Sequence, residues 1–306
     1  QFVLYWPTVT SAVALWRTSS AYNYGFLIVP IALYLIWEDR AAVRRMTPVQ
    51  WFPGLGVALA FGVLWYLAEL LGVNEGRHFA FVGMMHGIFL FALGWRIYRR
   101  LAFPFFYLWL LVPTGEFLIE PLQVMSRDAA VWLLKLSGIP VFTEGWTIEV
   151  PSGQFIVERG CAGLNFLLSS LALALVYAKL NYPRWSARIT CVLTAIVVSL
   201  LANNVRVFLI VAVTEWTHRR LNIADDHLLY GWAFFGVVML VCMWIGQRFA
   251  EPNPKPLPPE GIDFSLLWEV WHAVEANALN HEKLEDPQQL VFGAALQRSK
   301  KIIAVS

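Results

Sequence analysis

Three polar residues that could together perform acyl transfer stand in three different apolar segments of this 306-residue chain. Cys161 precedes one segment, Arg206 lies inside the next, and His227 precedes the last. A thiol is a nucleophile, an imidazole carries protons near neutral pH, and a guanidinium can stabilise a developing oxyanion. The three residue types therefore predict thiol-dependent acyl transfer if the fold brings them together.

Cys161 lies between Glu158 and Gly163, where a loop enters an apolar segment. A helix N-terminus favours the thiolate form of such a cysteine. The other two cysteines, Cys191 and Cys242, fall nearer the opposite ends of their segments, so Cys161 is predicted to be the lone thiol on its side of the membrane. The alternative interpretation is a small residue that eases helix packing.

Arg206 interrupts an otherwise apolar run, and Asn203 precedes it by three residues, on the same face of a helix. A permanent charge within a membrane segment is costly unless it meets a partner or a wet cavity. The neighbouring asparagine favours a polar site at this position. The alternative is that Arg206 extends its side chain to the nearby membrane interface.

His227 follows Asp226 at the start of the last apolar segment. Imidazole is the usual general acid or base near neutral pH. By composition alone His78, His86 and His218 are equally eligible, and a histidine beside acidic residues is often only solvated. The assignment to His227 therefore depends on its position next to a membrane segment.

The composition defines the environment in which these residues act. The chain is 58% hydrophobic and 14% charged, against about 25% charged residues in soluble domains. This excludes a water-soluble, single-core enzyme and predicts a polytopic membrane protein. A net charge of +2 gives no reason to expect nucleic acid, and three scattered cysteines indicate neither a disulfide framework nor a zinc cluster.

Apolar runs long enough to cross a bilayer predict an all-α polytopic fold with about eight transmembrane helices. Because the chain starts within an apolar stretch, we expect a first span at its beginning and further sequence before Gln1. The segment Leu118–Leu136 is predicted to be an amphipathic interfacial helix, because its apolar face is interrupted by Glu120, Gln123, Arg127, Asp128 and Lys135. The remaining spans are predicted at Gly25–Trp37, Pro53–Gly72, Phe79–Trp95, Leu101–Pro113, Ala162–Ala178, Ile189–Val213 and Tyr230–Gln247.

Basic residues in the connecting loops predict the orientation, because such loops stay in the cytoplasm. If the spans alternate, the basic loops all fall on one side, and Cys161, the outer end of the Arg206 segment and His227 come to the other. The active site is thus expected on the extracytoplasmic face. The basic residues are Arg40, Arg44, Arg45, Arg96, Arg99, Arg100, Lys179, Arg184, Arg188, Arg248 and Lys255.

The long segment before Cys161 has strand character. Thr147–Val150 and Phe155–Glu158 are β-prone and flank the turn-forming residues Pro151–Gln154. They predict a small extracytoplasmic β-hairpin, although an ordered loop that caps the bundle is an alternative.

The composition changes after Gln247, which predicts two domains: a transmembrane catalytic domain at 1–250 and a proline-rich linker with a cytoplasmic tail at 251–306. Prolines spaced this closely cannot continue a helix. The tail contains no residue pattern typical of catalysis.

These motifs together resemble the exosortase/archaeosortase family. That family has Cys-Ser-Gly at the start of one span, Asn-x-x-Arg in the next and His before the last. The matching residues here are Cys161-Ala162-Gly163, Asn203 to Arg206, and His227. Ala162 replaces the family serine, so any hydrogen bond from that hydroxyl is absent.

The resemblance implies a membrane cysteine transpeptidase. Its substrates would be exported proteins with a C-terminal tail made of a Pro-Glu-Pro-like motif, a membrane helix and a basic cluster. Cys161 would form a thioester, His227 would move protons and Arg206 would stabilise the oxyanion, with Glu158, Gly163, Asn203 and Asp226 in support. A surface acceptor of unknown identity would receive the product. The resemblance implies a place in the cytoplasmic membrane and no metal or organic cofactor.

Two other functions remain open at this stage. A hydrolase would use the same three residues with water in place of the acceptor. A transporter would use Arg206 to line a solute path, but that function predicts inverted repeats and broken helices, which the sequence does not show.

Overall fold

The structure, a computed structural model, describes residues 5–218 and 227–248, apart from the side chains of residues 227–230 and 232. The predicted linker and tail at 251–306 lie outside the described residues, so the domain boundary near residue 250 stays a prediction.

The first half of the described chain is helical. A break at Gly94 interrupts the long fifth helix, where the backbone leaves helical geometry. The elements in order are α1 (Trp6–Thr18), α2 (Gly25–Glu38), α3 (Arg40–Val43), α4 (Pro53–Leu70), α5 (Asn74–Arg100), α6 (Ala102–Tyr107) and the 3-10 turn η1 (Leu108–Leu111).

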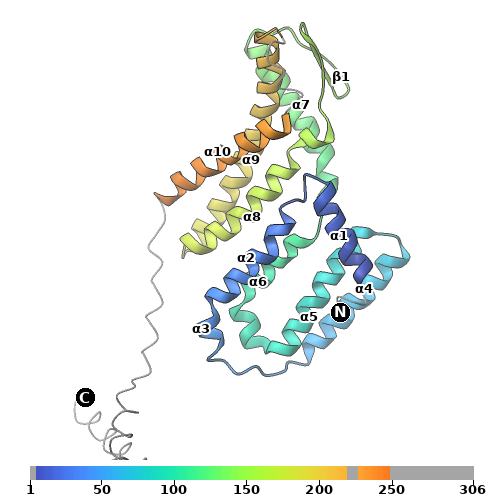
Figure 1. The fold of residues 1–306 in the computed structure, drawn as a ribbon, viewed down its shortest axis with the longest axis vertical. Helices are drawn as coiled ribbons and strands as arrows, with labels where there is room; N and C mark the ends of the chain where they lie inside the picture. The colour runs from blue at the N-terminus through green and yellow to red at the C-terminus, as the bar shows by residue number, and fades with distance from the viewer. Residues whose placement is uncertain (1–4, 219–226, 249–306) are drawn as a thin grey trace, which may run out of the picture. The chain divides into compact units, whose positions relative to one another are not determined.

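The second half adds a small sheet between helices. Its elements are η2 (Glu116–Leu118), α7 (Ile119–Leu136), β1 (Phe142–Glu144), β2 (Thr147–Val150), β3 (Gly153–Ile156), η3 (Arg159–Ala162), α8 (Leu164–Asn181), α9 (Trp185–Trp216) and α10 (His227–Gln247). Figure 1 shows this order along the chain.

The apolar helices confirm a polytopic helical membrane protein with a small sheet. Within the described residues, four helices are long and apolar enough to cross a bilayer: α4, α5, α8 and α9. A fifth span results if Ala102–Leu111 and Glu116–Leu136, which meet at a 67° bend, count as one. The helix α2 and the segment Ala233–Gln247 are apolar but shorter. The sequence predicted about eight spans, so the described residues give a smaller number.

The core of the first half lies where α2, α5, α6 and η1 meet. Ile28, Ile97, Phe105 and Tyr107 are buried there. Tyr107 donates a hydrogen bond of 3.2 Å to the Ala172 carbonyl and thereby connects this core to α8. The first half is therefore attached to the helix that follows Cys161.

The sheet is antiparallel, in the order β1-β2-β3. Its inner face, including Ile148 and Val150, packs on Leu134 of α7 and on Val207 and Val211 of α9. The predicted hairpin is thus present, with an additional strand. The three residues of β1 are all exposed, so this strand has no alternating apolar pattern by which the sequence could have predicted it.

The helices α8, α9 and α10 pack side by side (Figure 1). At one end of α8, Phe166 stacks on Phe235 with 4.6 Å between ring centroids. At the other end, Tyr177 donates a 3.0 Å hydrogen bond to the Met243 carbonyl and Tyr182 a 2.8 Å bond to the Gly246 carbonyl. The C-terminal end of α10 is therefore held by buried polar contacts, and the part nearer its N-terminus by aromatic packing.

Candidate active site

Cys161 lies in the 3-10 turn η3 between the edge strand β3 and the membrane helix α8. Its backbone N–H donates a 2.8 Å hydrogen bond to the Glu158 carbonyl, which closes the turn. Gly163 then caps α8 with a φ of +86°, a left-handed conformation that favours glycine. The structure thus places the thiol just before a helix N-terminus, in the position that the sequence indicated.

Asn203 connects α9 to the cysteine turn. Its amide Nδ2 donates a 3.0 Å hydrogen bond to the Cys161 carbonyl and a 2.9 Å bond to the Ser126 hydroxyl. The Ser126 hydroxyl donates in turn to Asn204 Oδ1 at 3.2 Å. Asn203 is 1% exposed and Ser126 is fully buried, so water does not compete for these bonds. The network fixes the backbone of the residue that carries the thiol.

Gly163 has a second role besides its φ angle. A Cβ atom at this position would lie 2.5 Å from Asn203 Cγ, closer than real Cβ contacts. The absence of a side chain therefore lets the start of α8 approach the Asn203 amide closely enough for the hydrogen bond to the Cys161 carbonyl.

Arg206 is inside the bundle, with an exposed fraction of 6%. Its guanidinium lies over the Phe166 ring of α8, 5.2 Å from the ring centroid. A Cβ on Gly231 of α10 would lie 2.7 Å from Arg206 Nε. The guanidinium is therefore enclosed by α8 and α10, which favours a polar site over an arginine that extends to the interface.

The electrostatics couple Arg206 to the thiol. Burial raises the pKa of the Cys161 thiol above its ordinary value, while the Arg206 charge acts in the opposite direction. The Glu158 carboxylate raises this pKa further, and a hydrogen bond from the Glu158 backbone to the thiol lowers it. The net direction is upward, so the thiol is largely protonated near neutral pH. A nucleophilic Cys161 therefore needs a base to remove its proton.

His227 is the first residue of α10, four residues before Gly231. One helical turn thus separates its backbone from the glycine that contacts Arg206. The His227 side chain and Asp226 lie outside the described residues. Glu158 is exposed; its backbone carbonyl accepts the hydrogen bond from the Cys161 N–H, and its carboxylate acts on the thiol only through its charge.

Two polar residues of α7, Gln123 and Ser126, are turned toward the site. Gln123, 7% exposed, donates from Nε2 to the Val157 carbonyl, and Ser126 reaches Asn203. The sequence predicted an interfacial helix with its polar residues at the membrane surface, but two of them are buried against the cysteine turn. The three-residue spacing of Gln123 and Ser126 is the signal that could have indicated this shared face.

The other cysteines lie away from Cys161. Cys191 packs beside Tyr177 and Tyr182 at the far end of α8, an 18-residue helix that is about 27 Å long at 1.5 Å per residue. All three cysteines are free thiols. Cys191 therefore provides a control position for experiments on Cys161.

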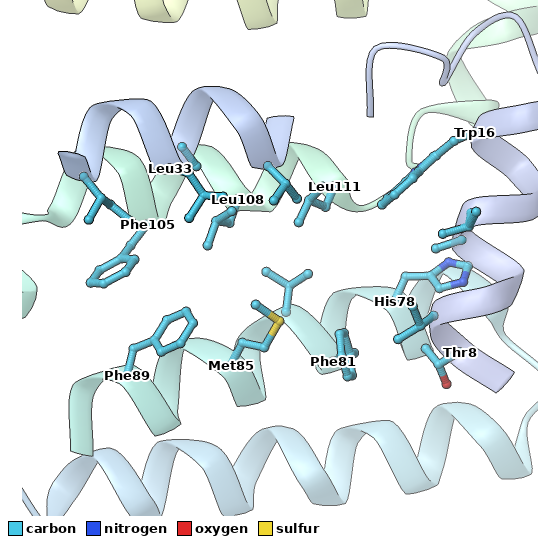
Figure 2. A pocket seen from close by; sticks show the side chains of 17 residues that line it. Thr8, Trp16, Leu33, His78, Phe81, Met85, Phe89, Phe105, Leu108 and Leu111 are labelled. Carbon is cyan, nitrogen blue, oxygen red and sulfur yellow. The ribbon is translucent and has the colours of Figure 1, made fainter. Parts of the chain in front are cut away.

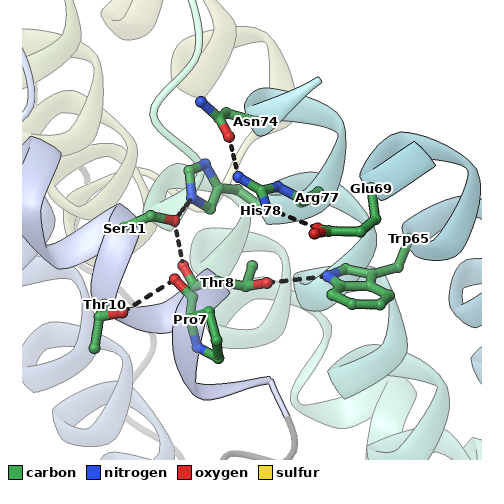
Figure 3. A network of polar contacts seen from close by, with 9 residues as sticks. All are labelled: Pro7, Thr8, Thr10, Ser11, Trp65, Glu69, Asn74, Arg77 and His78. Atoms are coloured by element: carbon green, nitrogen blue, oxygen red, sulfur yellow. Dashed lines mark hydrogen bonds and ion pairs between the residues drawn. The ribbon is translucent and has the colours of Figure 1, made fainter. Parts of the chain in front are cut away.

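The histidines of the first half have structural partners. His78 is 3% exposed, and its Nε2 lies 2.7 Å from the Ser11 hydroxyl. Figure 3 shows this pair within a polar network that also holds Thr8 and Trp65, 3.1 Å apart, and the Arg77–Glu69 ion pair.

A second histidine is held in the same way. The Nδ1 atom of His86 lies 2.8 Å from the Tyr98 hydroxyl, and its ring stacks on Trp109 with 5.0 Å between centroids. His218 is exposed at the end of α9, with a φ of +46°. The described contacts of His78 and His86 are thus made within the first half of the chain.

A cavity of about 420 Å³ lies beside His78, between α1, α2, α5 and η1. Figure 2 shows that apolar side chains surround it, with His78 and Thr8 at one end. Its lining includes Trp16, Leu33 and Met85. This cavity is thus apolar and belongs to the first half, whereas the polar contacts of Cys161 come from Asn203 of α9 and from its own turn.

The fold is that of a multi-pass membrane protein, and its candidate site is a polar cluster around the Cys161 thiol at the start of a membrane helix. The family model described as transmembrane exosortase (Exosortase_EpsH) matches residues 16–244, about three quarters of the chain. The chain therefore belongs to the transmembrane exosortase family. Membership supports a membrane transpeptidase or protein-sorting role in general. No curated protein and no solved structure matches the chain.

Proposed function

We propose that the protein is a cysteine transpeptidase that removes the C-terminal sorting tail of exported proteins and transfers them to a surface acceptor. The observation that carries this proposal is the contact between Asn203 and the Cys161 carbonyl, with the buried Arg206 one helical turn further along α9. Membership of the exosortase family favours this function over a transporter.

In the first half-reaction, the Cys161 sulfur attacks the backbone carbonyl carbon at the sorting motif, and His227 accepts the thiol proton. Arg206 stabilises the oxyanion of the tetrahedral intermediate. The carbon–nitrogen bond then breaks, His227 gives its proton to the leaving amine, and a thioester to Cys161 remains. The raised pKa of Cys161 fits this order of events, because a protonated thiol requires a base.

In the second half-reaction, a nucleophile on the acceptor attacks the thioester, and His227 takes its proton. The new bond forms as the carbon–sulfur bond breaks, and the Cys161 thiol is restored. If water replaces the acceptor, the same residues perform hydrolysis. The two outcomes differ in the mass that is added to the new C-terminus.

The positions of the basic residues support a site on the extracytoplasmic face of the cytoplasmic membrane. Arg100 at the end of α5 pairs with Asp39 at the end of α2 at 2.7 Å, so these basic ends are adjacent. Lys179 lies near the end of α8 opposite to Cys161. Since basic loops stay in the cytoplasm, the thiol faces outward.

The test is co-expression with an exported reporter that carries a Pro-Glu-Pro motif, a membrane helix and a basic cluster. The intact mass of the reporter is measured with the wild-type protein, with Cys161→Ala and with Cys191→Ala. We expect shortening with the wild type and Cys191→Ala and none with Cys161→Ala. Shortening by the Cys161→Ala variant would exclude the mechanism, and added mass on the shortened reporter identifies transfer.

A further inference from the structure

The strand β3 has an open edge. The Val157 N–H donates 2.9 Å to the Trp146 carbonyl, and Val150 pairs with Gly153 at the turn. In an antiparallel ladder the backbone groups of successive residues point alternately to the two sides of a strand. Gln154 and Ile156 therefore direct their N–H and C=O groups away from β2, and no described residue bonds to them.

Apart from its short length of four residues, this edge lacks the features that usually prevent pairing. Proteins protect an edge strand with lysine, proline, a bulge or a covering element. The strand β3 reads Gly-Gln-Phe-Ile and contains neither lysine nor proline. Gln154 and Ile156, the two outward-directed residues, are both exposed, Ile156 to 66%.

The open edge borders a groove whose lining stops at Gly160, one residue before Cys161. The groove has a volume of about 650 Å³ and runs between α7 and the chain that follows β3. Gly160, the last lining residue along the chain, directly precedes Cys161 in the sequence. Its lining is Ile119, Glu120, Gln123, Trp146, Ile156, Val157, Glu158, Arg159 and Gly160.

The chain between the edge and the thiol is fixed. Gln123 holds the Val157 carbonyl, the Cys161 N–H bonds the Glu158 carbonyl, and Asn203 bonds the Cys161 carbonyl. The Ser152 N–H at the hairpin turn bonds the Glu215 carboxylate at 2.8 Å. A strand that paired with β3 would thus be held at a set position relative to the nucleophile.

We propose that the substrate peptide binds as an added strand on β3, through the backbone groups of Gln154 and Ile156, and that the groove leads its scissile carbonyl to Cys161. This inference rests on the proposed function. The occupant is the extended segment that precedes the membrane helix of the substrate. Main-chain pairing supplies affinity in this binding mode, and side chains beside the edge supply specificity. Trp146 and Arg159 line the groove and are the specificity residues in this arrangement.

A second copy of the chain is a less suitable occupant. Pairing of two β3 strands would fill the same groove with protein and block access to Cys161 in both copies. A substrate strand in the groove would instead bring its own scissile carbonyl toward Cys161.

The first experiment compares two proline variants of the full-length protein. Ile156→Pro removes an outward N–H from β3 and leaves the bonds to β2 in place. Thr143→Pro is the matched control, since Thr143 lies between the β1 residues that pair with Glu149 and Thr147 and faces the opposite edge. We expect Ile156→Pro to lower kcat/KM for the reporter roughly threefold to tenfold, the value of one hydrogen bond, and Thr143→Pro to leave it unchanged.

The rate of Cys161 alkylation by iodoacetamide serves as the folding check for both variants. A wild-type alkylation rate together with wild-type kcat/KM in Ile156→Pro would overturn the strand addition. A changed oligomeric state of Ile156→Pro with unchanged kcat/KM would also overturn it and would assign the edge to pairing of two copies.

The second experiment needs no variant of the protein. Synthetic peptides with the reporter's sorting tail each carry one N-methylated backbone amide before the scissile bond. Strand addition predicts that methylation at every second position lowers kcat/KM and that methylation at the intervening positions does not. Loss at every position or at none would overturn it. If the wild type shortens no peptide, the proposed function itself fails, which separates that failure from the failure of strand addition alone.

Discussion

The two halves of the chain both bury polar side chains among apolar helices, but they use them differently. In the first half His78 pairs with Ser11 and His86 with Tyr98, and His78 lies beside an apolar cavity. In the second half the amide of Asn203 bonds to the backbone carbonyl of the residue that carries a thiol.

The difference shows that burial of a polar residue in a membrane segment is not enough to assign function. His78 is buried as deeply as Arg206, with exposed fractions of 3% and 6%. The charge of Arg206 acts on the Cys161 thiol, whereas His78 is held by the Ser11 hydroxyl and contributes to packing. The candidate site differs from a structural pair because the contacts of Asn203 and the charge of Arg206 both act on one residue, Cys161.

After Cys161→Ala, the largest effect is expected at Arg206. Removal of its guanidinium tests the candidate site in the second half of the chain directly. Arg206→Ala should lower reporter processing about 10²- to 10³-fold, as loss of an oxyanion donor does. Arg206→Lys should be nearly as inactive, because an ammonium lacks the planar pair of donors. Arg77→Ala, which breaks an ion pair of the first half, is the control and should process the reporter normally. Full activity of Arg206→Lys would reduce the role of Arg206 to simple charge.

A smaller effect is expected from two matched serine variants, one in each half. Ser126→Ala removes a partner of Asn203 and should lower kcat about tenfold, as loss of one buried hydrogen bond costs about 1–3 kcal/mol. It should also change the rate of Cys161 alkylation. Ser11→Ala removes the partner of His78 and should lower the thermal midpoint with unchanged kcat. Equal kcat in both variants would contradict the distinction between the halves.

The pH dependence of Cys161 tests the coupling within the site. The folded-state pKa of this thiol is raised, so its alkylation rate should increase with pH through a midpoint above the ordinary cysteine value. Arg206 lowers this pKa, so Arg206→Ala should move the midpoint still higher and slow alkylation at a given pH. Iodoacetamide labelling followed by mass spectrometry measures both midpoints. A midpoint that Arg206→Ala leaves in place would show that the two groups are not coupled.

The smallest effect is expected at Ala162, which replaces the family serine. Ala162 is fully buried beside Leu122 and Leu164. A serine adds one hydroxyl, which can donate a hydrogen bond to a carbonyl of the preceding turn. Ala162→Ser should therefore retain processing within about threefold, since a net hydrogen bond changes little. An inactive Ala162→Ser variant would show that this position was assigned to the wrong motif.

Much of the site follows from local rules. The three-residue spacing of Asn203 and Arg206 places both on one helix face, and the glycines around Cys161 indicate a turn before a helix. Ser126 could not be assigned in this way, because its partner Asn203 lies 77 residues away. Among the histidines, position and the family motif assigned His227, and this assignment stays a prediction because its side chain lies outside the described residues.

The sequence by itself determined a polytopic helical membrane protein, a small sheet before a thiol, and a pair of polar residues on the next helix. These features depend on composition and short-range periodicity. The tertiary structure decided that α7 turns Gln123 and Ser126 inward, that α8 and α10 enclose Arg206, and that β3 leaves an open edge next to the groove that precedes Cys161. These features depend on packing between segments distant in the chain, which only the balance of burial and hydrogen bonding over the whole fold can set.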